Sequence, residues 1–116
     1  MAVMTAVLAI HAHPDDIETL CAGTLAVLAA AGHQVRIATV TGGDLGSTAT
    51  APHETSAIRQ AEAARAAALI GAEYRCGGVP DLGVFNDDRA RRRVTELIRW
   101  GQADGVITGS AADYHP

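Results

Sequence analysis

Four consecutive residues, His13-Pro14-Asp15-Asp16, have the side-chain types best suited to chemistry in this sequence. Zn²⁺ binds imidazole nitrogen and carboxylate oxygen, and a catalytic zinc site keeps one position open for water. Pro14 fixes its own φ angle and so stiffens a turn, which can aim His13 and Asp16 at one point. Asp15 would project differently and could act on the water as a general base. The four residues therefore indicate a hydrolytic metal site.

Two other interpretations of this segment remain open. Asp15 is a good helix N-cap, and Glu18 three residues later resembles a capping box, while His13 could be a satisfied polar residue at a strand end. Alternatively, Asp15 and Asp16 could hold magnesium in a receiver-like or ligand-binding α/β module. Receiver chemistry usually needs a lysine after a later strand, and all nine basic residues here are arginine. The combination of one His, one Pro and two Asp favours the hydrolytic interpretation.

Alternating strand and helix patterns surround this segment. The alternation predicts an α/β fold, a Rossmann-like parallel sheet with helices on both faces. Ligands in such sheets lie beyond the carboxyl ends of the strands, where the polar segments 13–16, 42–47 and 110–116 are expected. The expected strands are 6–12, 35–41, 73–76 and 105–108, and the expected helices are 17–31, 54–70 and 87–100.

The composition argues against several classes of protein. The chain has 116 residues, 48% of them hydrophobic, which fits one domain or part of one. A net charge of −4 argues against nucleic-acid partners. Cys21 and Cys76 are far apart in sequence, so we expect two reduced thiols. The longest apolar stretch, residues 20–31, is too short to cross a bilayer, and a cytoplasmic location is expected.

Motifs along the whole chain resemble those of one family. Residues 12–18 (AHPDDIE) follow an apolar strand, and this is the most specific of them. Residues 59–62 (RQAE), 80–83 (PDLG) and 113–116 (DYHP) follow in the expected order, although the glycine of the family's P-D-G segment is displaced. Together they resemble the R-x-x-E, P-D-G and D-x-H-P-D-H motifs of the PIG-L/LmbE-like N-acetylglucosaminyl deacetylases.

The resemblance implies a zinc-dependent hydrolase, with another divalent metal possible, that removes an acyl group from an amino-sugar-type substrate. By position, His13 and Asp16 match two metal ligands of the family, and Asp15 matches its general base. His115 matches a histidine beside the substrate amide, where it could stabilise an oxyanion or protonate the leaving amine. The family's third ligand, a second histidine, would fall two residues beyond Pro116.

Three further residues are candidates with open alternatives. Arg59 could bind substrate hydroxyls or phosphate, or it could form a surface ion pair with Glu62 or Glu54. Asp81 could hydrogen-bond a sugar or simply serve a turn. His11 shares one strand face with His13 because side chains alternate along a strand; we expect it to support the site or to lie in the core.

The resemblance also sets expectations for the chain as a whole. Residues 1–116 are expected to form a single, incomplete deacetylase domain, with the fold truncated at its C-terminal end and no activity on its own. The expected partner is a small N-acyl amino sugar or conjugate, without nucleic acid or a membrane span, and a homo-oligomer is compatible with the sequence. A family member that has lost activity is the remaining alternative.

Overall fold

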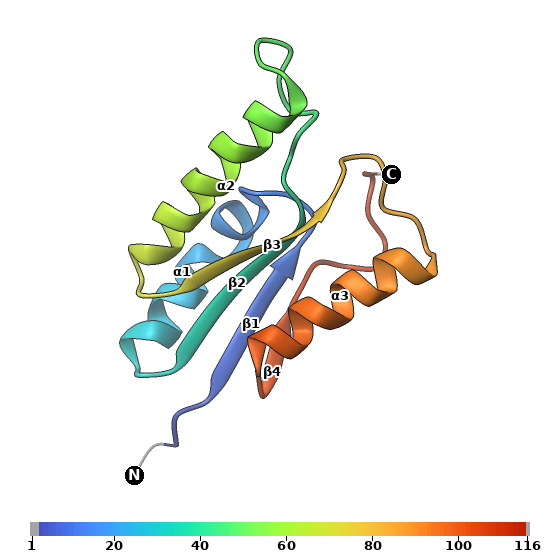
Figure 1. Ribbon diagram of the computed structural model, residues 1–116. Coiled ribbons are helices and arrows are strands. Elements are labelled where there is room, and N and C mark those ends of the chain that lie inside the picture. Colours follow the sequence, from blue (N-terminus) through green and yellow to red (C-terminus); the bar gives the residue numbers. More distant parts are fainter. Residues whose placement is uncertain (1–2, 116) are drawn as a thin grey trace.

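The computed structural model describes residues 3–115 and shows one four-stranded sheet covered by helices (Figure 1). All strand pairings are parallel, in the order β3-β2-β1-β4. The predicted parallel α/β architecture is therefore confirmed. In chain order, the elements are β1 (Ala6–His11), α1 (Asp16–Ala30), β2 (Gln34–Thr41), α2 (Pro52–Ala68), β3 (Glu73–Val79), α3 (Asp88–Gly101) and β4 (Gly105–Ile107).

The two faces of the sheet have separate apolar cores. On one face, Ala9 of β1 packs with residues of α1 and α2 that include Leu25 and Ala67. On the other face, Leu8 and Ile10 pack against α3. Because successive side chains of a strand point to opposite faces, a continuous apolar run such as β1 requires cover on both sides. Leu8 is completely buried, which contributes about 1.5–3 kcal/mol to stability.

The strand directions bring all the strand-to-helix loops to one edge of the sheet. β1 lies between β2 and β4, with Val7 opposite both Val35 and Gly105. Parallel strands end at a common edge, so the loops after β1, β2, β3 and β4 meet there (Figure 1). This is the edge where the sequence places its polar segments.

Strand β3 is longer than the sequence indicates. It runs to Val79, three residues beyond the predicted end at Cys76, and it rejoins β2 through a register shift that places Thr41 opposite Val79. Glycines 77 and 78 disfavour a strand by propensity. In the structure, a Cβ on Gly77 would lie 2.9 Å from the carbonyl oxygen of Val40. The close approach of two backbones therefore requires glycine where propensity predicts a loop.

Helix boundaries differ from the predicted ones by one or two residues. Helix α2 begins at Pro52. Proline is well suited to this position, because the backbone N–H that it lacks would have no partner within the helix. In α3, Leu97 is buried, whereas the neighbouring Ile98 is 44% exposed. The buried residues of α3 are Ala90, Leu97 and Gly101. Within residues 3–115, no helix is long and apolar enough to cross a membrane.

Candidate active site

The turn between β1 and α1 holds Asp15 in an unusual conformation. Asp15 occupies the N-cap position with φ 111° and ψ −24°, and its side chain makes no capping hydrogen bond. The capping-box interpretation is therefore wrong. Its carboxylate is instead 68% exposed and lies 3.4 Å from Nη2 of Arg59. Burial raises the pKa of Glu18, and the charges of Asp15 and Asp16 add to that rise.

Asp16 organises the turn in place of Asp15. Its Oδ2 accepts a hydrogen bond from the backbone N–H of His13 at 2.8 Å and lies 2.8 Å from Nδ1 of His11. The backbone N–H of Ala12 also lies 2.9 Å from that Nδ1. A carboxylate only accepts, so we assign the proton of His11 to Nδ1, which then donates to Asp16 and cannot also accept from the Ala12 N–H. His11 therefore supports the site, which is the first of the two roles expected for it.

His13 lies between two carboxylates. Its Nδ1 is 3.4 Å from Asp16 Oδ2, and its Nε2 is 3.4 Å from Asp81 Oδ1. The Asp81 side chain is only 8% exposed. It accepts hydrogen bonds from the Thr41 hydroxyl at 2.6 Å and from the Leu45 N–H at 3.1 Å. Asp81 is therefore a buried partner of the site rather than only a turn residue.

The loop around Asp81 departs from the sequence pattern expected for it. Leu82 has φ 59° at the position where the P-D-G segment places glycine. Glycine adopts this left-handed conformation without strain, whereas a leucine does not. The backbone N–H of Asp81 donates to Asp44 Oδ1 at 2.7 Å, which ties this loop to the one after β2. The glycine can be displaced by one residue because other contacts hold the turn.

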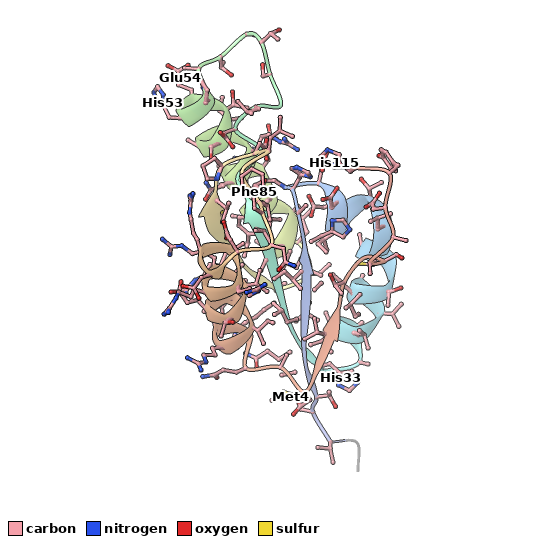
Figure 2. The ribbon with its side chains drawn as sticks, turned by 90° about the vertical axis from the view of Figure 1, so that its right-hand side faces the viewer. Met4, His33, His53, Glu54, Phe85 and His115 are labelled. Atoms are coloured by element: carbon pink, nitrogen blue, oxygen red, sulfur yellow. The ribbon has the colours of Figure 1, made fainter. Side chains whose placement is uncertain are left out.

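His115 approaches the site from the far end of the described chain. Its ring centroid lies 5.0 Å from that of His13, with the ring planes at 61°. Figure 2 shows His115 and Phe85 near one end of the sheet, with Met4 and His33 at the opposite end. The structure thus places His115 beside His13. Pro116, which completes the expected D-x-H-P segment, lies outside the described residues.

Two hollows meet at His13 and His115. The smaller, of about 320 Å³, is bordered by Asp15, Arg59 and Asp81 and is the more polar of the two. The larger, of about 500 Å³, lies over the ends of β1 and β2, and its wall is mostly apolar. Its apolar residues are Ile10, Ala12, Val40, Leu82, Val84, Phe85 and Val94. A ligand reacting at His13 would therefore have polar surroundings on one side and apolar surroundings on the other.

His13 and Asp16 fit a zinc ion in donor type and in spacing. Two donors at about 2.0–2.1 Å from a tetrahedral Zn²⁺ lie roughly 3.3–3.4 Å apart, and His13 Nδ1 lies 3.4 Å from Asp16 Oδ2. Among residues 3–115, however, no group of three or more His, Cys, Asp or Glu side chains is arranged to hold a metal ion. Because catalytic zinc usually has three protein ligands, His13 and Asp16 alone would not complete such a site.

Arg59 points into the site rather than along its own helix. Its guanidinium donates to the carbonyl oxygens of Pro14 at 2.5 Å and of Gly43 at 3.3 Å, and it pairs with Asp15. The surface ion pair with Glu62 or Glu54 is therefore not the arrangement found. Arginines 91, 92 and 93 of α3 instead make exposed contacts with Asn86, Asp88 and Glu96.

Sequence reasoning missed Thr41 and the apolar wall of the larger hollow. Thr41 is buried at the end of β2 and binds Asp81; its place at the carboxyl end of a predicted strand was the available signal. The exposed apolar residues Leu82, Val84 and Phe85 form part of that wall. Their clustering in a segment expected to be a loop could have indicated a binding surface.

The fold and the site together define an α/β protein whose imidazole and carboxylate groups gather at the carboxyl edge of a parallel sheet. A family model described as "PIG-L: GlcNAc-PI de-N-acetylase" matches residues 8–116. The chain therefore belongs to the PIG-L family, and the resemblance seen in the sequence is confirmed. This membership favours the deacetylase interpretation over the receiver-like module.

Solved structures show the same fold. The N,N'-diacetylchitobiose deacetylase from Pyrococcus horikoshii is 30% identical with a TM-score of 0.84, over 95% of this chain and 43% of that one. A deacetylase of the teicoplanin biosynthetic pathway is 25% identical with a TM-score of 0.79, over 97% and 54%. The present chain thus spans about half the length of these structures.

A third structure shows how far the fold extends. GalB, the 4-carboxy-2-hydroxymuconate hydratase from Pseudomonas putida KT2440, is 23% identical with a TM-score of 0.84, over 97% of this chain and 50% of that one. At this identity the likeness concerns the fold alone. Because a protein described as a hydratase shares the fold, the reaction must be argued from the site residues.

Proposed function

We propose that this chain forms the metal-binding part of a zinc-dependent hydrolase that removes an acyl group, in the first instance acetyl, from an amino-sugar-type substrate. Membership of the PIG-L family and the deacetylases of similar structure support this proposal. The observation that carries it is the turn after β1. There the donor atoms of His13 and Asp16 lie 3.4 Å apart, next to the exposed carboxylate of Asp15.

His13 and Asp16 would hold the metal, with a third protein ligand from outside the described residues. Zinc, when bound, supplies Lewis acidity that polarises an amide carbonyl and favours ionisation of water at neutral pH. Another divalent cation could serve the same purpose. The protein's contribution is to fix the donors. Asp16 is held by His11 and by the backbone of His13, so the carboxylate is already oriented before a metal arrives.

Asp15 and His115 are assigned to proton transfer. The exposed Asp15 carboxylate borders the smaller hollow, where it can take a proton from the attacking water. His115 lies across that hollow beside His13. From there it can donate to the developing negative oxygen or to the leaving nitrogen. Amide hydrolysis requires one group that accepts a proton and another that donates one, and Asp15 and His115 would fill these two roles.

The smaller hollow would receive the hydroxyl-bearing part of the substrate. Asp81 and Arg59 border it, and each offers hydrogen-bonding groups suited to hydroxyls. Its volume of about 320 Å³ is at the low end of the roughly 300–1,000 Å³ typical of small-molecule sites. We therefore propose a small N-acyl amino sugar or conjugate as substrate, with its amide at His13.

We also propose that the protein works in the cytoplasm. Its two cysteines, Cys21 and Cys76, are both free and partly buried. Burial raises the pKa of Cys21, which keeps its thiol protonated and unreactive. Free thiols are typical of the reducing cytoplasm, whereas disulfides persist in secreted and extracellular proteins.

The test is Asp15→Asn in the whole protein. We expect zinc content to be unchanged and acetate release from N,N'-diacetylchitobiose or N-acetylglucosamine to fall by about 10²–10⁴-fold, because an amide cannot accept the proton. Asp88→Asn, an exposed aspartate on α3, is the control and should retain full activity.

Three results would count against the proposal. An unchanged rate in Asp15→Asn would remove Asp15 as the base. Binding of magnesium in preference to zinc would favour the receiver-like module. Zinc binding without hydrolysis of any N-acetyl amino sugar would indicate a family member without activity.

A further inference from the structure

Arg59 links three segments that are far apart in sequence. From α2 its Nη2 donates to the Pro14 carbonyl oxygen at 2.5 Å, and its Nη1 donates to the Gly43 carbonyl oxygen at 3.3 Å. The same Nη2 lies 3.4 Å from Asp15 Oδ2. The side chain is about three-quarters buried in doing so, at 24% exposure. Two of its five N–H groups are therefore occupied by the protein's own main chain before any substrate arrives.

The glycine-rich loop after β2 is shaped around this guanidinium. A Cβ on Gly46 would lie 2.6 Å from Arg59 Nη1, and a Cβ on Gly43 would overlap the same group. Neither position can carry a side chain while Arg59 stays where it is. Gly43 and Gly46 thus have a physical explanation, because they leave a slot for one arginine, whereas a Cβ on Gly42 would meet Ser56.

The backbone at Asp15 needs an external support. At φ 111° it lies in the left-handed region that residues with a Cβ rarely adopt. Such conformations persist only where the surrounding structure holds them. The Asp15 side chain does not supply that support, since it makes no cap hydrogen bond. Arg59 binds the carbonyl of the preceding peptide and the carboxylate of Asp15 itself, so it holds the strained residue through its backbone and through its side chain.

We propose that Arg59 is a positioning residue that holds the turn of Asp15 in its reactive conformation, using a slot made by Gly43 and Gly46. This inference rests on the proposed function for the role of Asp15 as base, and it goes beyond substrate binding by Arg59. A substrate contact acts only when substrate is present. A positioning contact shapes the turn at all times, so its loss is measurable in the free protein.

The primary test is amide hydrogen exchange in the chain without metal or substrate. The backbone N–H groups of Asp16 and Thr19 bond to the carbonyls of His13 and Asp15 and report on the turn. In Arg59→Ala we expect both to exchange at least about tenfold faster, as local opening becomes easier, while the amides of β1 and β2 keep their protection. Arg65→Ala, an exposed arginine on the same helix, is the matched control and should change neither.

Two further variants test the contact of Arg59 with the turn in other ways. Gly46→Ala should displace the guanidinium from its slot and accelerate exchange at Asp16 with Arg59 still present. Arg59→Lys keeps the charge but not the planar fork that reaches two carbonyls, so it should restore only part of the protection. These variants keep the test decisive if Arg59→Ala loses protection throughout the sheet.

Kinetics separates this inference from the proposed function. At saturating substrate, Arg59→Ala should lower kcat by at least about tenfold, because the base is no longer aligned, and a rise in KM alone would indicate substrate binding only. Unchanged exchange at Asp16 and Thr19 in Arg59→Ala and Gly46→Ala would overturn the positioning role even if the protein deacetylates. Accelerated exchange would support it even if the reaction proved to be another one.

Discussion

The buried carboxylate of Asp81 offers a sharp test of how the site is held together. We expect Asp81→Ala to destabilise the fold although Asp81 belongs to no helix or strand. The carboxylate accepts hydrogen bonds from the Thr41 hydroxyl at 2.6 Å and from the Leu45 N–H at 3.1 Å. The substitution removes both acceptors at once and leaves a gap that the loop after β3 cannot easily fill.

The size of the effect follows from how buried each donor is. Thr41 is 1% exposed, so its unpaired hydroxyl costs about 1–3 kcal/mol. Leu45 is half exposed, so water can replace the lost acceptor and the net cost is only about 0.5–1 kcal/mol. The sum is roughly 1.5–4 kcal/mol. Asp81→Asn should cost about 1 kcal/mol, because its amide oxygen can accept from Leu45 and its NH₂ can donate to Thr41.

Urea unfolding at pH 7 measures these differences. With a slope of about 2 kcal/mol per molar urea, the middle of the range for a small domain, Asp81→Ala should lower the midpoint by roughly 0.8–2 M. The matched control is Asp88→Ala, whose pair with Arg92 is about three-quarters exposed on both sides and contributes at most about 1 kcal/mol. If Asp81→Ala shifts the midpoint no further than Asp88→Ala, the buried hydrogen bonds do not stabilise the fold as described.

Three further predictions concern the metal, alkaline pH and helix packing. His13→Ala and Asp16→Ala should each abolish tight zinc binding in calorimetric titration; parent-like affinity in either would remove that residue as a ligand. Burial raises the pKa of Tyr74, so its contribution to stability is present below about pH 10 and lost as pH rises above it. The alkaline fall in urea midpoint should be smaller in Tyr74→Phe, and an identical fall would contradict this. Gly101→Ala should lower stability by about 1–3 kcal/mol, because its Cβ would lie 2.9 Å from Leu8 Cδ2; an unchanged melting temperature would show that α3 can move away.

The architecture could be predicted from sequence because each element has a strong local signal. β1 is a short apolar run, and a glycine with positive φ follows the end of both α1 and α2, at Gly32 and Gly71. The end of β3 could not be predicted, since Gly77 is required by the close approach of β2 and Gly78 adopts a positive φ, and neither follows from strand propensity. The same is true of Ile98, whose exposure depends on how α3 sits on the sheet.

The site was predictable where its residues are close in sequence and less so where they meet in space. Residues 13–16 form one turn, so their common location follows from the chain itself. The partnership of His13 with Asp81 depends on two loops of different strands being fixed to each other by Thr41. Likewise, the sequence permitted a surface role for Arg59. Its guanidinium points into the site only because α2 lies against the turn after β1.

The central position of β1 has a consequence for how the chain folds during synthesis. β1 precedes the other strands, yet one of its two neighbours is β4, so Val7 pairs with Gly105, 98 residues later. Contacts of such long range are slow to form because a large loop must close first. Until β4 has left the ribosome, one edge of β1 lacks its partner strand and its backbone N–H and C=O groups remain unpaired. Nascent chains of this fold should therefore depend on chaperones most strongly before residue 105 emerges.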